Sequence, residues 1–230
     1  MKKLYLGKTK DVYEIDDYHV MLRFKDDVTG KDGIFDPGEN QVGLKIDGQG
    51  YNNLMMSSYF FTLFESKGIK THMVKSDGKQ EMLVRKVSHF GKGLEVIVRF
   101  KAMGSFLRRY GDVVKAFDPL NGLIEFTLKD DDLGDPLIVE DALVALRLVS
   151  VEDLKQIKTM TKNISNIIKD VCVEKGLDLI DLKLEFGKDL ETGEILLMDE
   201  VSSGNMRVYQ DGTMVDSLDL AYILEVLNRA

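Results

Sequence analysis

One short segment restricts the local fold more than any other part of the chain. Residues 181–187 read DLKLEFG, in which charged and apolar residues alternate strictly. Successive side chains of a β-strand point to opposite faces, so the pattern predicts a strand with Asp181, Lys183 and Glu185 on one face. Residues 196–200 read as a buried strand that ends in two acids, and the polar link 188–193, flanked by glycines, predicts a hairpin between the two strands.

The hairpin supports two interpretations. It brings Glu185 close to Asp199, and two carboxylates that converge at a strand end can hold a hard divalent cation. Mg²⁺ takes one or two carboxylates together with substrate phosphates, so this interpretation predicts a magnesium and phosphate site. In the second interpretation the hairpin is solvated and its charges only face water.

Length and composition narrow the class of protein. The chain has 230 residues, enough for one large domain or two closely joined lobes. Its net charge is −8 and it has no long Lys/Arg run, which argues against a nucleic-acid partner. The single cysteine, Cys172, excludes an internal disulfide and is expected to be a small buried hydrophobe. Three scattered histidines have no metal-ligand spacing, and without a signal peptide or membrane-spanning run the sequence predicts a cytoplasmic protein with no membrane partner.

Strand and helix patterns alternate irregularly, and neither a linker nor a repeat divides the chain. Strand patterns occupy residues 12–15, 19–24, 81–87, 94–99 and 122–128. Helix patterns occupy residues 51–67, 151–175 and 218–227, with Ser150 as the cap of the second, and Ser105 is expected to cap a short helix of its own. Residues 29–50 are rich in Gly and Asp and are expected to form one long loop. This mixture predicts an α+β fold.

Several short motifs are weak when taken alone. Gly7-Lys8-Thr9-Lys10 lacks Walker A spacing, but in an extended segment Lys8 and Lys10 share a face, where they would either bind a polyphosphate or only protect a strand edge. Residues 129–136 read as an acidic turn. Arg99, followed by Gly104-Ser105, suggests an anion site, and Arg207 either binds a second anion or balances the acids before it.

Taken in chain order, these segments resemble SAICAR synthetases, the phosphoribosylaminoimidazole-succinocarboxamide synthases of purine biosynthesis. The resemblance covers about residues 4–209. It rests on the blocks GKTKDVY (7–13), KDDVT (25–29), EMLVRKV (81–87), LEVIVR (94–99) with Gly104-Ser105, KDDDLGDP (129–136), and DLKLEFG (181–187) with Asp199-Glu200. The last block is specific to the family, and the others gain weight from their order.

The resemblance implies an ATP-grasp-like α+β fold with a nucleotide-binding lobe at residues 1–88, a metal and acceptor lobe at residues 89–230, and ATP between them. It implies a ligase that joins the carboxylate of carboxyaminoimidazole ribotide to the amine of aspartate through an acyl phosphate, with ATP and Mg²⁺. The implied partners are these small molecules and, in a homodimer, a second copy of the chain. The implied catalytic residues are Lys8, Lys10 and Lys129; the implied nucleotide site adds Val12, Met82, Val84 and Lys86; the implied metal ligands are Glu185 and Asp199; and the implied acceptor site holds Arg99, Ser105, Asp181 and Arg207.

The chain departs from the family pattern mainly on the acceptor side. Gln49 stands where the family has Lys, Gly93 where it has Pro, and Phe100 where it has Asn. Val139 and Ala142 replace the Asn and the His of the family's Asn-Glu-Asp-His motif, and residues 203–205 follow Ser202 where the family has Pro-Asp. The family's C-terminal Lys-Asp-x-Phe-Arg motif has no counterpart in residues 209–230. Losing several charge-assisted contacts, each worth roughly 1.5–3 kcal/mol, would weaken a ribotide site unless other cations replaced them. Candidate replacements are Lys31, Lys45, Lys101, Arg108 and Arg109.

Three functions therefore stay open at the level of sequence. The first is a divergent SAICAR synthetase, and the second is a paralogous ligase that takes another acceptor or amine. The third is a nucleotide-binding module without turnover. The retained lysines and metal carboxylates favour the first two, because a module without turnover has no chemical reason to keep them.

Overall fold

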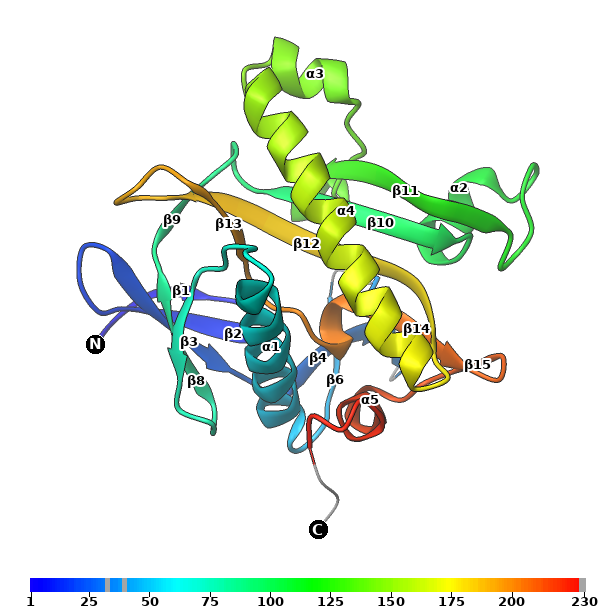
Figure 1. The fold of residues 1–230 in the computed structure, drawn as a ribbon, viewed down its shortest axis with the longest axis horizontal. Helices are drawn as coiled ribbons and strands as arrows, with labels where there is room; N and C mark the ends of the chain where they lie inside the picture. Colours follow the sequence, from blue (N-terminus) through cyan, green and yellow to red (C-terminus); the bar gives the residue numbers. More distant parts are fainter. Residues whose placement is uncertain (32–33, 39–40, 228–230) are drawn as a thin grey trace. The chain divides into compact units, whose positions relative to one another are not determined.

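The computed structural model describes residues 1–31, 34–38 and 41–227 (Figure 1). The chain forms two compact units that are interleaved along the sequence. Unit 1 contains Met1–Ser88, Gly187–Asn205 and Asp216–Ala230, and unit 2 contains His89–Phe186 and Met206–Val215. No helix in the described part of the chain is both long and apolar enough to cross a membrane.

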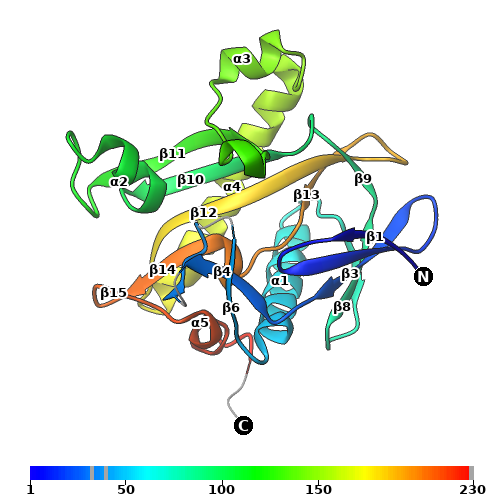
Figure 2. The same ribbon diagram turned by 180° about the vertical axis from the view of Figure 1, so that it is seen from behind.

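Unit 1 is built on a five-stranded antiparallel sheet in the order β1-β2-β3-β8-β7. The strands are β1 (Lys2–Leu6), β2 (Lys10–Glu14), β3 (His19–Phe24), β7 (Met73–Ser76) and β8 (Glu81–Arg85). Burial alternates along β3, so that Val20, Leu22 and Phe24 are buried on one face. Helix α1 (Gln49–Ser66) lies in front of the sheet in Figure 1 and behind it in the reverse view of Figure 2, and it contacts β3 and β7.

The segment at residues 29–50 corrects the prediction of one long loop. It contributes three strands, β4 (Asp27–Lys31), β5 (Ile34–Phe35) and β6 (Val42–Lys45), which form a separate sheet in the order β5-β4-β6. Glycine is disfavoured in strands unless two backbones approach closely, which is the case here. A Cβ atom on Gly43 would lie 2.4 Å from the carbonyl carbon of Gly30. Residues 32–33 and 39–40 of this segment lie outside the described residues.

The C-terminal parts of unit 1 return to α1. Strand β13 (Ile195–Met198) is followed by the short 3₁₀ turn η2 (Ser203–Asn205), and helix α5 (Ser217–Ile223) contacts both α1 and η2. The predicted C-terminal helix is thus present but shorter than residues 218–227. Asp216 caps it by accepting a hydrogen bond from the backbone of Leu218 at 2.9 Å.

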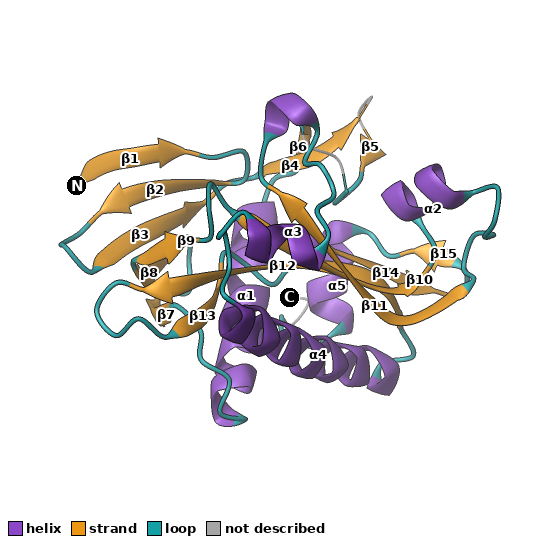
Figure 3. Ribbon diagram, turned by 90° about the horizontal axis from the view of Figure 1, so that it is seen from above, coloured by secondary structure: helices purple, strands orange, loops and turns teal. Residues whose placement is uncertain are grey.

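Unit 2 is built on the strand order β11-β10-β12-β14-β15. The strands are β10 (Leu94–Lys101), β11 (Pro119–Leu128), β12 (Asp178–Asp189), β14 (Met206–Gln210) and β15 (Thr213–Met214), and β9 (Val87–His89) and β13 also pair with β12. Helix α4 (Val151–Glu174) contacts β10 and β11 and lies to one side of these strands in Figure 3. The sequence predicts one apolar face of this helix with Leu154, Ile157, Ile164, Ile168 and Val171; the first four are buried and Val171 is half-buried, and Cys172 is buried as expected.

Two predicted helix caps have different outcomes. Ser150 caps α4 by accepting a hydrogen bond from the backbone of Asp153 at 3.0 Å, as predicted. Ser105 does not cap α2 (Gly104–Tyr110), because Met103 occupies the cap position and Ser105 lies inside the helix. Its hydroxyl instead accepts a hydrogen bond from Arg99 at 2.9 Å. The remaining short elements are α3 (Glu140–Ala145) and the 3₁₀ turn η1 (Asp131–Leu133), which lies in the predicted acidic turn.

The hairpin predicted from residues 181–187 and 196–200 is present as β12 and β13. The turn is closed by a hydrogen bond from the backbone N–H of Asp189 to the carbonyl of Glu194 at 2.8 Å. The solvated interpretation is wrong, because β12 is buried on both faces. Asp181 and Glu185 are only 4% and 5% exposed, so the charged face of this strand is held by partners and not by water.

Candidate functional site

The GKTK motif forms the turn between β1 and β2. The backbone N–H of Gly7 donates to the carbonyl of Lys10 at 2.9 Å, and a Cβ atom on Gly7 would lie 2.3 Å from that oxygen, so this turn requires glycine. Lys8 and Thr9 form the two-residue loop, and β2 begins at Lys10. The expectation that Lys8 and Lys10 share the face of one strand is wrong, because the turn separates them.

Lys10 is the most buried of the predicted phosphate-binding lysines, with 8% of the residue exposed. Its ammonium group lies 3.1 Å from the Asp199 carboxylate and forms a short ion pair with Glu200. Burial alone would lower the pKa of Lys10, but the carboxylates of Asp199 and Glu200 raise it well above its ordinary value. The Glu200 carboxylate also accepts hydrogen bonds from Thr9 and Ser202. This cluster is therefore a fixed cation between two carboxylates.

Asp199 has an unusual backbone. It follows the last residue of β13 and has φ of +65°, the left-handed region that L-residues rarely adopt. Burial lowers the pKa of His72 to about 4, while the negative charge of Asp199 acts in the opposite direction. His72 is therefore a neutral, buried imidazole near physiological pH. The sequence identified Asp199 as a candidate site residue, but it gave no signal that His72 would be buried.

The other residues predicted for the nucleotide side lie on strands β2 and β8 of the unit 1 sheet or directly after β8. Val12 is opposite Leu22, and Leu22 is opposite Met82, so the three share one face. Met82 and Val84 are 0% and 1% exposed. Lys86 follows β8, is partly exposed, and lies 3.6 Å from the Glu14 carboxylate.

A network of neutral polar side chains lies next to Glu200 and has no counterpart among the predicted site residues. Gln49 donates to Asn53 at 2.7 Å and to Ser203 at 3.0 Å, and Ser203 donates to Asn53 at 3.1 Å. All three residues are at least 98% buried. Two positions that depart from the family pattern, Gln49 and Ser203, are thus in direct contact within unit 1.

The acceptor-side residues predicted in unit 2 form one buried charge ladder. The strand register places Arg99 of β10 opposite Asp181 of β12, and Asp181 opposite Arg207 of β14. Asp181 accepts hydrogen bonds from Arg99 at 3.1 Å and from Arg207 at 2.9 Å. Arg99 also donates to Glu125 and to Ser105. The structure therefore brings Arg99, Ser105, Asp181 and Arg207 together.

Glycine makes room for this ladder. Gly104 has φ of +53°, and a Cβ atom there would lie 2.8 Å from the guanidinium group of Arg207. Gly93, which stands where the family pattern has proline, makes room for Lys129 in the same way. A Cβ atom added to Gly93 would lie 3.1 Å from the Lys129 side chain.

A second charged row lies on the same face of β10 and β12. Lys129 donates to both oxygens of the Glu185 carboxylate, at 2.8 and 3.0 Å. Lys183 donates to Glu95 at 2.7 Å. Burial alone would lower the pKa of Lys183, but Glu95 and Glu185 raise it above its ordinary value.

The two predicted metal ligands lie in different units: Asp199 beside Lys10 in unit 1, and Glu185 beside Lys129 in unit 2. Over residues 1–31, 34–38 and 41–227, no group of three or more His, Cys, Asp or Glu side chains could hold a metal ion. Each of the two carboxylates is instead paired with a lysine.

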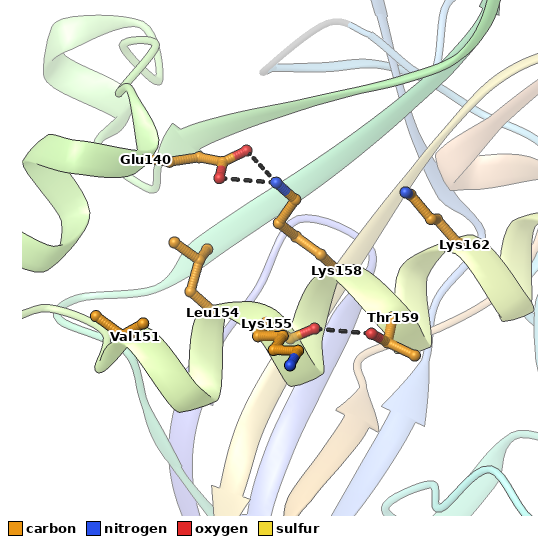
Figure 4. Close-up of a pocket in the computed structure, with 7 residues that line it drawn as sticks. All are labelled: Glu140, Val151, Leu154, Lys155, Lys158, Thr159 and Lys162. Carbon is orange, nitrogen blue, oxygen red and sulfur yellow. Dashed lines mark hydrogen bonds and ion pairs between the residues drawn. The ribbon is translucent and has the colours of Figure 1, made fainter.

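A surface cavity of about 350 Å³ lies between α3 and α4 of unit 2 (Figure 4). Its lining is Glu140, Val151, Leu154, Lys155, Lys158, Thr159 and Lys162. Lys158 is paired with Glu140 at 2.7 Å across it. None of the predicted site residues lines this cavity, so it is separate from both charged clusters.

Comparison with known proteins gives consistent matches along the whole chain. The SAICAR synthetase family model matches residues 3–223. A phosphoribosylaminoimidazole-succinocarboxamide synthase from Clostridium tetani (strain Massachusetts / E88) is 45% identical over 225 residues, which cover 97% of this chain and 99% of that protein.

Solved structures agree with the sequence comparison. The crystal structure of phosphoribosylaminoimidazole-succinocarboxamide synthase from Ehrlichia chaffeensis matches with a TM-score of 0.87 and 27% identity, covering 99% of this chain and 100% of that one. A SAICAR synthetase in complex with ADP matches with a TM-score of 0.82 and 31% identity, covering 98% and 94% of the two chains. The predicted α+β fold is confirmed by these matches.

Proposed function

Because the chain belongs to the SAICAR synthetase family, we propose that it joins the carboxylate of carboxyaminoimidazole ribotide to the amine of aspartate with the use of ATP. The chain is an ATP-dependent carbon–nitrogen ligase of purine biosynthesis and has the ATP-grasp-like α+β fold of this family. The observation that carries the choice of substrates is the 45% identity to a named synthase over nearly the full length of both chains.

The cluster of Lys10, Asp199 and Glu200, here called the unit 1 cluster, supplies the phosphate contacts in this proposal. A carboxylate is a poor electrophile, so it is first activated by the γ-phosphoryl group of ATP, a step that needs positioning and charge neutralisation more than a covalent protein group. Lys10, together with Lys8 in the adjoining turn, supplies positive charge for the phosphates. Val12, Met82, Val84 and Lys86 belong to the adenine side on the basis of the family resemblance alone.

The carboxylates fit a magnesium ion that is bound mainly through the nucleotide. Mg²⁺ usually takes one or two protein carboxylates and completes its shell with phosphates and water, so a preformed three-ligand cluster is not required. Asp199 and Glu185 are the proposed ligands, and when bound the ion would neutralise charge on the phosphates. In the structure Lys10 pairs with Asp199 and Lys129 pairs with Glu185.

The buried ladder of unit 2 is the proposed acceptor site. Arg99, Arg109 and Arg207 gather three guanidinium groups around two carboxylates, Asp181 and Glu125. Such a cluster suits an anionic ligand, and Ser105 adds a hydroxyl beside it. Asp181 holds the two guanidinium groups in place, while Lys129 is proposed to act at the nucleotide.

An ADP-release assay tests the proposal against its alternatives. Purified protein is given ATP, Mg²⁺, aspartate and carboxyaminoimidazole ribotide, and we expect ADP release that requires both substrates. Release only with another carboxylate or amine would favour the paralogous ligase. Nucleotide binding without release across a broad substrate panel would favour the module without turnover.

A double variant tests the metal ligands separately. We expect Glu185→Gln with Asp199→Asn to abolish Mg²⁺-dependent turnover while the protein stays folded, because both proposed oxygen ligands lose their charge. Glu191→Gln with Asp132→Asn removes two carboxylates from exposed positions and is the matched control. Full activity in the first variant would exclude the metal assignment. A cytoplasmic location and a homodimer stay predictions that cell fractionation and light scattering can test.

A further inference from the structure

We propose that the cavity between α3 and α4 of unit 2 is a second anion site, which binds a small phosphate monoester that carries an apolar group (Figure 4). The cavity is separate from the proposed ligase site, because none of the residues assigned to the nucleotide, the metal or the acceptor lines it. Its chemistry comes from lysines on one face of α4 and from an apolar wall beside them.

The lysines of the cavity follow the period of the helix. Lys155, Lys158 and Lys162 lie three and four residues apart, a spacing that places them on the same side of α4. In Figure 4 the side chains of Lys158 and Lys162 rise from α4 on the side of Glu140, whereas the ammonium group of Lys155 points away from Glu140. Lys158 and Lys162 therefore supply the nearer positive charge, and Lys155 adds to it from the edge of the cavity.

Only one carboxylate lines the cavity. Glu140 accepts two hydrogen bonds from Lys158, at 2.7 and 2.8 Å. Over the described residues, the ammonium groups of Lys155 and Lys162 have no carboxylate partner. The two acidic residues in the first turn of α4 do not line the cavity. Three ammonium groups thus share one carboxylate, and like charges at this helical spacing repel each other unless an anion lies between them.

The remaining lining defines the rest of the ligand. Leu154 is buried and Val151 is exposed, so an apolar wall adjoins the lysines. Lysine is a common ligand of phosphate groups, and the wall suits an apolar group attached to the phosphate. The volume of about 350 Å³ lies at the lower end of the range for ligand cavities, about 300–1,000 Å³, which suits a small molecule.

A large polyanion fits these observations less well. The chain has a net charge of −8, and the cavity contributes only three ammonium groups, whereas a nucleic acid needs an extended positive surface. A phosphate monoester needs only one or two of these ammonium groups, and its apolar group needs only the short wall at the start of α4.

The test is an NMR titration of the full ¹⁵N-labelled chain with phenyl phosphate, read at the backbone amides of α3 and α4. For a ligand of this size we expect saturable shifts there, with a Kd of about 1–5 mM. Inorganic phosphate and benzyl alcohol probe the two ends of the ligand separately. Each should bind at least about threefold more weakly than phenyl phosphate, because each lacks one of the two contacts.

Two variants should move the affinity in opposite directions. Lys162→Met removes an exposed ammonium group and should weaken the binding of phenyl phosphate about threefold. Glu140→Gln releases Lys158 from its carboxylate and should strengthen binding about twofold. Lys115→Met, at an exposed lysine of unit 2 that does not line the cavity, is the matched control and should leave the Kd unchanged.

Unchanged binding in Lys162→Met, or weaker binding in Glu140→Gln, would overturn the site. Shifts spread over exposed lysines throughout the chain would also overturn it, because they would show attraction to surface charge in general. Equal affinity for inorganic phosphate would overturn the part of the apolar wall. Since the shifts are read at α3 and α4, these outcomes do not depend on whether the chain has the proposed ligase activity.

Discussion

Replacing Lys10 by methionine is the most informative perturbation of the unit 1 cluster. Methionine has a similar length and retains the apolar stem, so the change removes little except the ammonium group. Glu200 is left buried, with 5% of its side chain exposed, and Asp199 is left with 28% of its side chain exposed. Two neighbouring carboxylates then lose the ammonium group that lies between them.

The size of the effect follows from these contacts. At an effective dielectric constant of about 20, the charge pair at 3.1 Å between Lys10 and Asp199 has a gross attraction of about 5 kcal/mol, part of which desolvation offsets. Breaking one side of a buried ion pair costs about 3–5 kcal/mol. We expect about 3 kcal/mol, because Asp199 can regain water. For a chain of this length that corresponds to a fall in melting temperature of roughly 6–12 °C.

The Lys10→Met variant should lose both turnover and stability, and only the loss of stability should be partly reversed by Mg²⁺. We expect its turnover to fall by about 100-fold or more, because a charged contact to the transferred phosphoryl group is lost. Added Mg²⁺ should recover part of the lost melting temperature, since a divalent cation can replace the ammonium group between the two carboxylates. Thermal unfolding with and without Mg²⁺, and ADP release, measure the two effects.

A matched control lies in the same unit. Lys70 pairs with Glu194 at the surface, where both side chains are about half exposed, so Lys70→Met should change stability by no more than about 0.5 kcal/mol. A wild-type melting temperature in Lys10→Met would refute the buried ion pair. Turnover within about fivefold of the wild type would refute the phosphate role of Lys10, because it lies far below the loss expected for such a contact.

Two further predictions concern Gly104 and His72. Gly104→Ala should push the Arg207 guanidinium group off Asp181. Because a charge-assisted hydrogen bond is worth about 1.5–3 kcal/mol, we expect the KM of the acceptor to rise at least about tenfold while the KM of ATP stays unchanged. A rise in the KM of ATP alone would contradict the acceptor assignment. The pKa of His72, about 4 in the folded chain against 6.5 for a free imidazole, means that the unfolded chain takes up the proton first as pH falls. Stability from this group is complete above pH 6.5 and is lost towards pH 4, so denaturant unfolding at pH 7 and pH 5 should show a fall about 2 kcal/mol larger in the wild type than in His72→Gln. Equal falls would show that His72 titrates normally.

The substrate-side departures from the family pattern have a physical setting in the structure. Gln49 and Ser203 hydrogen-bond to each other in a buried neutral network, and Gly93 leaves room for Lys129. Phe100 is buried in unit 2, where the Lys169 ammonium lies 4.9 Å from its ring. These positions are packed against their neighbours, but the Gln49 Oε1 atom is buried and has no hydrogen-bond partner within the described residues.

The fold was predictable where a pattern is local. Strict alternation over residues 181–187, the cap at Ser150 and the apolar stripe of α4 each follow from side chains a few residues apart, and all three are present. The segment at residues 29–50 was not predictable, because its strands are stabilised by the close approach of Gly30 and Gly43, which lie on different strands. Glycine reads as loop in a single sequence, since its strand role depends on a partner backbone.

The sequence by itself determined the family, the ligase chemistry and the identity of the charged residues, because each depends on residue types in a fixed order. Tertiary structure decided how those charges are used. It buried Lys10 between Asp199 and Glu200, set Asp181 between Arg99 and Arg207 by strand register, and buried His72 against Phe61. These partners are far apart in the chain, and the energy of a charge depends on its burial and its neighbours. The residues of the hairpin could therefore be read from the sequence, but their protonation, pairing and backbone strain could not.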